Sequence, residues 1–331
     1  AYIERSLDGS AVTLARLEDL GLLKAWQGRY SVAFNYLTLE DQVLLMRALQ
    51  PYAESLARAY RDRWPQLDAL FSAYDAAGVP DGEVAYAVIG AMSLDWDGLE
   101  LTAGKGLRVT AEQLPAGRDF FLWAKEQSAE INTKGLYWGS HNTVAGGVQF
   151  TTFGDHHTLP RIGLPDLIWR MNRNKAEIED LPESLRQSMR AALAPEYRDE
   201  FLQDAGAILR LLRKEPVTGR TVSASTGISP ERSQATLRLL QDLQYVHASE
   251  GSYALAHPYF SQADKAMLDA VRALSSEMME KWLDQHHSAM RDSLADLNGL
   301  RYGSPYRQLF TEIWHNLFGR ANRSLVQSGP F

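Results

Sequence analysis

The chain gathers chemically versatile side chains between Gly139 and His157. This segment contains His141, Asp155, His156 and His157. Imidazole and carboxylate groups are common metal ligands. One hypothesis is a metal site formed by His141, Asp155 and one of the two adjacent histidines. Only one of that pair can be a ligand if they lie on a strand, because neighbours on a strand point to opposite faces. The alternative is a group of polar loop residues at the end of a hairpin, so the sequence identifies neither a metal nor a cofactor.

Nucleophilic catalysis would need another combination of side chains from this segment. Ser140 or Thr151 would be the nucleophile, and His141 or His156 would be the base. The sequence has no G-x-S-x-G elbow, the turn that exposes such a serine in α/β hydrolases. We therefore assign no catalytic residue and favour a chain that is not an enzyme.

Two carboxylates form a separate candidate acid–base pair. Asp95 and Asp97 flank Trp96, and on a strand they would share one face. A general acid and a general base can be arranged in this way. A solvated strand edge explains the same spacing, and we favour that explanation.

Aromatic side chains concentrate in the same half of the chain and favour a pocket for a small organic ligand. The concentrated residues are Trp96, Trp123, Tyr137, Trp138, Phe150, Phe153 and Trp169. With the histidine segment included, the predicted ligand-binding residues are Trp96, Tyr137, Trp138, His141, Phe153 and His156. The alternative is that the aromatic residues form the core of an ordinary α+β domain.

Capping signals, glycines and prolines indicate the elements that would position these residues. Thr38 and Asp41 resemble a capping signal, and Pro51 interrupts the apolar periodicity that follows, which predicts one helix and its restart. Helices are predicted at 38–50, 51–63, 66–76, 81–93 and 110–130. Strands are predicted at 135–139 and 147–153, with turn residues at 140–146.

A compact series of helix signals opens the C-terminal half. A helix with one apolar stripe is predicted from Asp204 to Lys214, and a short helix from Thr218 to Thr226. Gly227 is typical of the position after a helix end, and Ser229-Pro230 is typical of a helix start. Alternating residues between 245 and 255 predict a β-hairpin.

This order of elements resembles the winged helix-turn-helix superfamily, which includes bacterial regulators of the MarR, ArsR and IclR types. The resemblance covers residues 204–257 and is carried by TVSASTGISPERSQATLRLLQDLQYVHASEGSYALA, from Thr221 to Ala256. Gln244 departs from the pattern, because such domains very often have glycine there. The helix that begins at Pro230 would be the recognition helix. Its predicted buried residues are Ala235, Leu239, Leu240 and Leu243.

The resemblance implies that the recognition helix lies in the major groove of double-stranded DNA and reads bases with its exposed N-terminal half. The predicted DNA-binding residues are Arg220, Arg232, Ser233, Thr236 and Arg238. Arg210, Arg213 and Lys214 lie nearby in the sequence and are expected to meet the DNA backbone. Winged helices also serve as protein-interaction modules. A methyltransferase role is disfavoured, because no glycine-rich strand-to-helix loop follows Leu255.

Composition limits which classes of protein and of functional site remain. The absence of cysteine excludes disulfides, cysteine zinc sites, iron–sulfur clusters and a thiol nucleophile. The formal net charge of -7 argues against a non-specific nucleic-acid binder, although a locally basic face is compatible with it. No run approaches the roughly 20 apolar residues that span a bilayer, and no signal peptide is visible. We therefore expect a cytoplasmic protein that does not use a membrane.

The C-terminal residues predict two long helices, one beginning near Ser261 and one at Ser304-Pro305. After a winged helix, such helices commonly form a dimer interface; the alternative is that they pack on the N-terminal domain of their own chain. We expect a mostly helical α+β fold with an N-terminal α+β sensor domain that contains a small β-hairpin sheet. The predicted segments are 1–175 (sensor), 176–203 (helical linker), 204–257 (winged helix) and 258–331 (C-terminal helices).

The leading hypothesis from sequence is a ligand-responsive, DNA-binding transcriptional regulator that acts as a homodimer. One alternative is an enzyme or a metal- or cofactor-binding protein that uses the 137–157 hairpin region, with the winged helix as a scaffold. A further alternative is a protein-interaction module.

Overall fold

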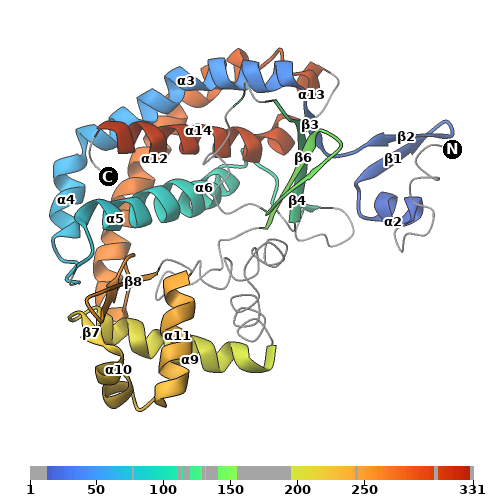
Figure 1. Cartoon of the computed structure of the whole chain (residues 1–331). Helices are drawn as coiled ribbons and strands as arrows, with labels where there is room; N and C mark the ends of the chain where they lie inside the picture. The colour runs from blue at the N-terminus through green and yellow to red at the C-terminus, as the bar shows by residue number, and fades with distance from the viewer. Residues whose placement is uncertain are drawn as a thin grey trace. The chain divides into compact units, whose positions relative to one another are not determined.

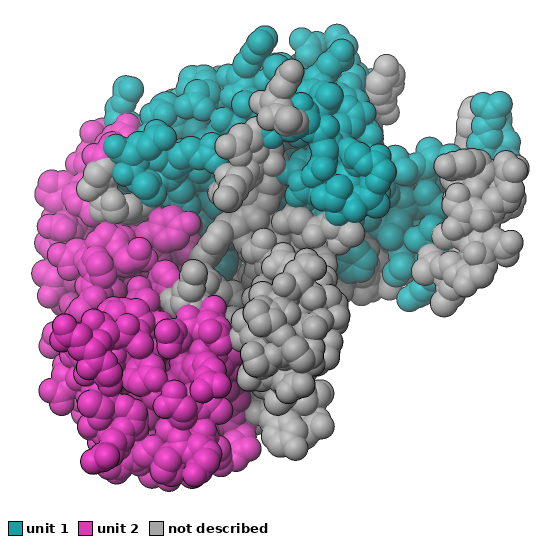
Figure 2. Space-filling model, viewed as in Figure 1, with its two compact units in different colours: residues 1–60, 94–158, 276–327 teal, residues 61–93, 159–275, 328–331 magenta. Residues whose placement is uncertain are grey.

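The chain has a mostly helical α+β fold with small sheets, as predicted, in the computed structural model (Figure 1). The structure describes residues 13–76, 78–110, 113–114, 120–128, 131, 141–154, 195–242, 245–301 and 305–328. Two compact units are coloured separately in Figure 2. Unit 1 comprises residues 1–60, 94–158 and 276–327, and unit 2 comprises residues 61–93, 159–275 and 328–331. Each unit is made of separate stretches of the chain. The four predicted consecutive segments, from the sensor domain to the C-terminal helices, stay a prediction.

A four-stranded sheet in unit 1 has the order β3-β4-β6-β5. Its strands are β3 (Asn35–Leu37), β4 (Phe120–Glu126), β5 (His141–Ala145) and β6 (Val148–Gly154). β3 runs parallel to β4, whereas β6 is antiparallel to both β4 and β5. The register places Trp123 opposite Thr151 and Lys125 opposite Gln149, so these four side chains share one face of the sheet.

This sheet corrects two predictions and confirms one. Residues 120–126 were expected inside a helix and form β4, because aromatic residues such as Phe120, Phe121 and Trp123 favour strands and the segment pairs with β3 and β6. Residues 141–145 were expected in a turn and form β5, and the hairpin turns instead at Gly146 and Gly147, both with positive φ. The strand predicted at 147–153 is confirmed as β6. The strand predicted at 135–139 lies outside the described residues.

Helix α3 (Leu39–Asp62) begins as predicted but does not break at Pro51. The Asp41 backbone N–H donates to Thr38 Oγ1 at 3.1 Å, and the Thr38 backbone N–H donates to Asp41 Oδ2 at 3.1 Å, which completes a capping box. Leu49 and Ala53 flank the proline and are almost fully buried. Packing of this buried face offsets the cost of a proline inside the helix.

The helical region after α3 contains an unusual π-helix. Its elements are α4 (Trp64–Phe71), α5 (Asp81–Ala85), the π-helix η1 (Tyr86–Asp97) and α6 (Gly98–Gly104). The expectation that Asp95 and Asp97 lie on a solvated strand edge is wrong, because both are buried on η1. π-helical segments are rare and occur frequently at functional sites.

Near the N-terminus lie α2 (Leu14–Asp19) and a hairpin of β1 (Leu23–Trp26) and β2 (Arg29–Val32), none of which the sequence analysis predicted. The hairpin turns at Gln27 and Gly28, which both have positive φ.

The helices and the hairpin predicted for a winged helix lie in unit 2 in the predicted order, and we call this part of the chain the winged helix. Its elements are α9 (Pro195–Leu212), β7 (Val217–Thr218), α10 (Gly219–Thr226), α11 (Pro230–Asp242), β8 (Val246–Ser249) and β9 (Ser252–Leu255). The sheet has the order β7-β9-β8 and is antiparallel throughout. Gly227 ends α10 with a φ of 74°, and the Arg232 backbone N–H donates to the Ser229 hydroxyl at 3.3 Å at the start of α11. Val222, Leu237 and Leu255 belong to its buried core.

Two long helices, α12 (Lys265–Ser293) and α14 (Tyr306–Ser328), follow the winged helix, with the short α13 (Asn298–Arg301) between them. The capping box predicted from Ser261 and Asp264 is present before α12. None of the helices formed by the described residues has the apolar length that a bilayer crossing needs.

Helix α14 lies in the interior of unit 1, beside α3 and α6 (Figure 1). Every residue from Leu309 to Gly319 is buried. Ser324 Oγ donates to Glu54 Oε2 of α3 at 2.9 Å, and Trp314 Nε1 donates to the Leu94 carbonyl oxygen at 2.9 Å. The apolar face of α14 that was expected to meet a second copy is therefore covered within unit 1, and the homodimer stays a prediction.

Candidate functional site

Helix α11 exposes a different face from the predicted one. Ser233 and Thr236, expected to face outward, are only 1% and 5% exposed, whereas Ala235, expected to be buried, is exposed. The Ser233 hydroxyl donates to the Ile228 carbonyl oxygen at 3.3 Å, which allows a small polar side chain to be buried at little cost. Leu239 and Leu240 are buried as predicted. Leu243 and Gln244 lie outside the described residues.

Arg232 is exposed, but its guanidinium is held within the winged helix. Nε and one terminal nitrogen donate to Asp204 Oδ2 at 3.0 and 2.7 Å, and the other terminal nitrogen pairs with Glu200. The hydrogen bonds to Asp204, with the nearby charge of Glu200, raise the pKa of Arg232 above its ordinary value. Both carboxylates belong to α9. Arg232 therefore fastens α11 to α9, and a phosphate would have to compete with two carboxylates for it.

Arg213, expected near the DNA backbone, is also occupied inside unit 2. Both of its terminal nitrogens donate to the Asp264 carboxylate, one of them also donates to Ser261 Oγ at 3.0 Å, and Nε donates to the Asp75 carbonyl oxygen at 2.9 Å. Burial alone would raise the pKa of Asp264, but hydrogen bonds from Arg213 and Ser261 lower it below its ordinary value. Arg213 therefore anchors the start of α12.

Exposed polar residues remain as candidate DNA contacts, and Arg210 and Lys214, expected near the DNA backbone, are exposed too. Arg220 lies on α10, and Gln234 and Arg238 lie one turn apart on α11. The Gln234 side-chain amide donates to the Tyr253 hydroxyl of β9 at 3.2 Å, which links α11 to the sheet of the winged helix. Arg220 and Arg238 were predicted as contacts. Gln234 was missed because the apolar stripe was assigned from alanine and leucine alone, without the buried serine and threonine.

The structure describes only some of the predicted ligand-binding residues. Trp96 is buried on η1. His141 lies on β5 and Phe153 on β6, but their side chains are not described, and Tyr137, Trp138 and His156 lie outside the described residues. The metal hypothesis also involves Asp155 and His157, which lie outside as well. Among the described residues, no group of three or more histidine, aspartate or glutamate side chains is arranged to hold a metal ion.

A set of ionisable and polar side chains is buried between the sheet and α14 of unit 1. We call it the buried polar cluster, and its members are Asp95, Lys125, Thr151, Glu312, His315 and Asn316, each at most 4% exposed. They come from η1, β4, β6 and α14. The Trp123 ring meets the His315 ring edge-on at 5.6 Å between centroids, which connects this face of the sheet to α14.

Asp95 and His315 face each other in the buried polar cluster. His315 Nδ1 lies 2.7 Å from the Thr311 carbonyl oxygen, so Nδ1 carries the proton and donates it there. Nε2 lies 4.0 Å from Asp95 Oδ1. Burial raises the pKa of Asp95 to about 8, because water no longer stabilises its charged form. At neutral pH the Asp95 carboxyl is therefore mainly protonated.

Lys125 and Glu312 form the second part of the cluster. Burial lowers the pKa of Lys125 to about 8, and the negative charge of Glu312 opposes this effect only in part. Asn316 Nδ2 donates to Glu312 Oε1 at 2.9 Å, which orients the carboxylate one turn along α14. The sequence offered one signal: Glu312, His315 and Asn316 are polar residues among the apolar residues between Leu309 and Phe318. Without contacts, such residues are naturally assigned to a solvated face.

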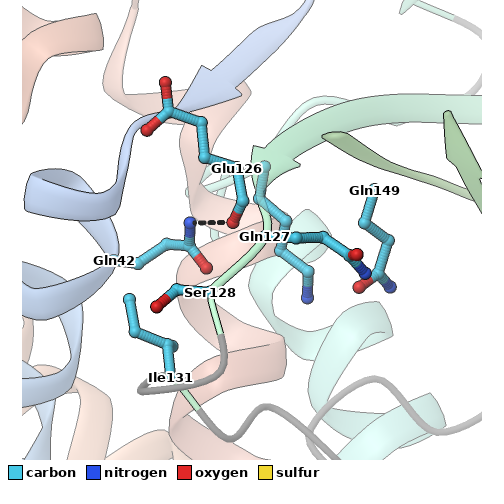
Figure 3. A pocket seen from close by; sticks show the side chains of 7 residues that line it. Gln42, Glu126, Gln127, Ser128, Ile131 and Gln149 are labelled. Atoms are coloured by element: carbon cyan, nitrogen blue, oxygen red, sulfur yellow. Dashed lines mark hydrogen bonds between the residues drawn. The ribbon is translucent and has the colours of Figure 1, made fainter. Parts of the chain in front are cut away.

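A cavity of about 300 Å³ adjoins this cluster in unit 1 (Figure 3). Its lining residues are Gln42, Lys125, Glu126, Gln127, Ser128, Ile131 and Gln149. Figure 3 shows the Gln127 and Gln149 side chains directed toward one another, whereas the Glu126 carboxylate points away from them. That carboxylate accepts from the Tyr36 hydroxyl at 3.2 Å and the Leu39 backbone N–H at 2.8 Å. Trp96, whose side chain is the one described among the six predicted ligand-binding residues, is not among the described residues that line this cavity.

Comparisons with models of protein families, with curated proteins and with solved structures found no match to this chain.

Proposed function

We propose that the chain is a regulator that binds double-stranded DNA through α11 of its winged helix and takes a small polar ligand in the cavity of unit 1. The observation that carries the DNA-binding part is the exposed pair Gln234 and Arg238, one turn apart on α11. Arginine and glutamine are the side chains that pair bidentately with guanine and adenine in the major groove. Their spacing allows both to reach neighbouring base edges.

The other DNA-facing residues have different roles in this proposal. Arg220, exposed on α10, meets the phosphate backbone and sets the orientation of the domain. Ser233 and Thr236 support the packing of α11, and Arg232 supports its attachment to α9 through Asp204. Ligand response follows if the ligand binds two conformations of the chain with different affinities, since only differential affinity shifts their populations.

Selection of duplexes from a random library, followed by affinity measurement on the selected sequence, tests this proposal. Arg238→Ala is expected to weaken specific binding by about 1 to 3 kcal/mol and to relax the preference at one base pair. Arg220→Ala is expected to weaken binding to all duplexes alike. Lys24→Ala serves as the matched control, because Lys24 is an exposed cation of β1 outside the winged helix.

Two results would count against DNA binding. One is a selection that enriches no sequence above non-specific affinity. The other is an enriched duplex whose affinity is unchanged in Arg238→Ala and in Arg220→Ala. Arg232→Ala is a poor probe, because it removes the contacts with Asp204 and Glu200 inside the protein and changes the attachment of α11 at the same time.

A further inference from the structure

Lys125 has the environment of a reactive amine rather than of a surface lysine. It is 2% exposed, lies on β4 between the strands β3 and β6, and contributes to the wall of the 300 Å³ cavity. Lysine is rarely buried to this extent without a specific reason. A buried lysine that borders a cavity can meet a ligand without first moving through the protein core.

The protonation of Lys125 differs from that of another lysine in the same unit. Burial lowers the pKa of Lys125 to about 8 against the opposing charge of Glu312. Hydrogen bonds to Asp284 and Glu280 instead raise the pKa of Lys105 above its ordinary value. At pH 7, an amine with a pKa of 8 is uncharged in roughly one molecule in ten, about 300 times the fraction for an amine with a pKa of 10.5. Only the uncharged form is a nucleophile.

Apart from Lys125 itself and Glu126, whose carboxylate points away from Gln127 and Gln149, the described residues of the cavity wall are uncharged, and most carry hydrogen-bonding groups. Gln127 and Gln149 offer amide donors and acceptors, and Ser128 lies on the same wall. The Gln42 side-chain amide donates to the Glu126 carbonyl oxygen at 2.8 Å, so that side chain is oriented before any ligand arrives (Figure 3). The volume is at the small end of the range for ligand pockets. Such a wall suits a small, polar, oxygen-rich molecule.

We propose that Lys125 forms an imine with a small carbonyl compound, an aldehyde or a 2-oxo acid, bound in this cavity. This inference rests on the ligand-binding part of the proposed function and is independent of DNA binding. The amides of Gln127 and Gln149 hold the oxygen atoms of the ligand, and Lys125 supplies the nucleophile. The geometry that carries the proposal is the joint lining of one cavity by a buried amine and by paired amides.

The covalent step is a condensation that neither oxidises nor reduces the ligand. The ammonium of Lys125 first loses a proton, which passes to Glu312, the acidic group whose charge already acts on it. The nitrogen lone pair then forms a bond to the carbonyl carbon, and the carbonyl oxygen gains a proton as the nitrogen loses one, which gives a carbinolamine. Glu312 then returns its proton to the hydroxyl, the carbon–oxygen bond breaks, the oxygen leaves as water, and a protonated carbon–nitrogen double bond remains. Hydrolysis reverses each step.

Reductive trapping on the full chain tests the proposal. The protein is incubated with glyoxylate or pyruvate as the 2-oxo acid and with sodium cyanoborohydride, which converts an imine to a stable secondary amine. Intact mass and peptide mapping are expected to show one adduct, on Lys125, formed at least tenfold faster than on any exposed lysine. Its rate is expected to rise with pH to a midpoint near 8. In Glu312→Gln the midpoint is expected to move to lower pH, because the charge that favours the ammonium is gone.

Controls keep the test decisive whether or not each variant folds well. Lys125→Met and Lys125→Arg should lose the adduct, and Lys105→Met should keep it. Mapping on the unaltered protein needs no variant.

The proposal is overturned if adducts fall only on exposed lysines, or if Lys125→Arg forms the same adduct. Thermal stabilisation by pyruvate without any adduct would also overturn it, while leaving the ligand-binding part of the proposed function standing. Failure to select a DNA sequence would bear on α11 and not on Lys125.

Discussion

A carboxyl group as deeply buried as Asp95 is stable in a protein core when it is neutral, because no water solvates its charge. His315 Nε2 lies 4.0 Å from Asp95 Oδ1, and that ring already donates its Nδ1 proton to a backbone carbonyl. The Asp95 carboxyl is therefore neutral at low pH and becomes charged as the pH rises above its pKa. Because burial removes the water that would solvate the charged carboxylate, the pKa of Asp95 rises to about 8.

Asp95→Asn is expected to stabilise the protein at neutral pH and to have little effect near pH 4. The pKa of Asp95 is about 8 in the folded chain, against an ordinary value of 3.8. Between these values the folded state binds more protons than the unfolded state, so stability falls as the pH rises from about 4 to about 8. Asparagine removes that dependence. At 1.36 kcal/mol per pKa unit the gain at pH 7 is at most about 4 kcal/mol, and relaxation around the site reduces it.

Urea unfolding of the native chain and of Asp95→Asn at several pH values between 4 and 8 measures this difference. The gap between the two curves should widen steadily with pH. A constant gap would show that the aspartate does not change its protonation on folding. A gap that narrows with pH would mean that Asp95 is held in its charged form by a partner.

The arginines of the winged helix illustrate what sequence could not reveal about single residues. Arg232 and Arg238 lie on the same helix, six positions apart, and were both predicted to meet DNA. Asp204, which holds Arg232, is 28 residues away along the chain, and no local pattern signals that partnership. Arg238 stays on the exposed surface near Asp242, whose pKa is raised by burial and lowered in part by Arg238. The candidate site was therefore predicted by residue type but not by partner.

At the scale of elements, the winged helix was predictable because its signals are local. Thr218 caps α10, Gly227 ends it, and Ser229 with Pro230 starts α11, each within one turn of the element that it controls. The central sheet of unit 1 was not predictable in the same way. Strand β4 pairs with β3, whose partner residues lie 88 positions earlier in the sequence, so no local signal reveals this pairing. The π-helix η1 has the apolar composition of an ordinary buried helix, and periodicity does not distinguish the two.

The approach of α6 to α14 depends on a single glycine. A Cβ at Gly98 would lie 2.4 Å from Cζ2 of the Trp314 indole. That ring is completely buried, and its Nε1 donates to the Leu94 carbonyl oxygen at 2.9 Å, so it has little freedom to move. Gly98→Ala is therefore expected to destabilise the protein by about 1 to 3 kcal/mol, the usual cost of overpacking. Chemical unfolding monitored by tryptophan fluorescence measures this loss.

Gly104→Ala is the matched control for this prediction. Gly104 ends the same helix, and a Cβ there would have no atom within 4 Å. Alanine at this position should leave stability unchanged or raise it by up to about 1 kcal/mol, because it restricts the unfolded chain. Equal effects of the two substitutions would mean that helix propensity, and not the Trp314 contact, controls Gly98.

At the scale of the whole molecule, the net charge of -7 limits how strongly DNA can be attracted. A protein with many phosphate contacts loses affinity steeply as salt is added, because each contact releases a counterion. In α10 and α11 the arginines Arg220 and Arg238 are exposed, and Arg232 is held by carboxylates of its own domain. The proposed interface therefore gains little from counterion release and must rely more on base contacts.

The logarithm of the association constant is accordingly expected to fall with the logarithm of the salt concentration at a slope of about -2 for each bound winged helix. Between 50 and 200 mM salt, this corresponds to roughly a tenfold loss of affinity per winged helix, which fluorescence anisotropy on the selected duplex can measure. Arg220→Ala should make the slope shallower by about 1, and Gln234→Ala should leave it unchanged, because a neutral amide releases no counterion. A slope near -8 per winged helix would require many more phosphate contacts than these helices expose. Such a slope would mean that the protein binds DNA through a surface other than α11.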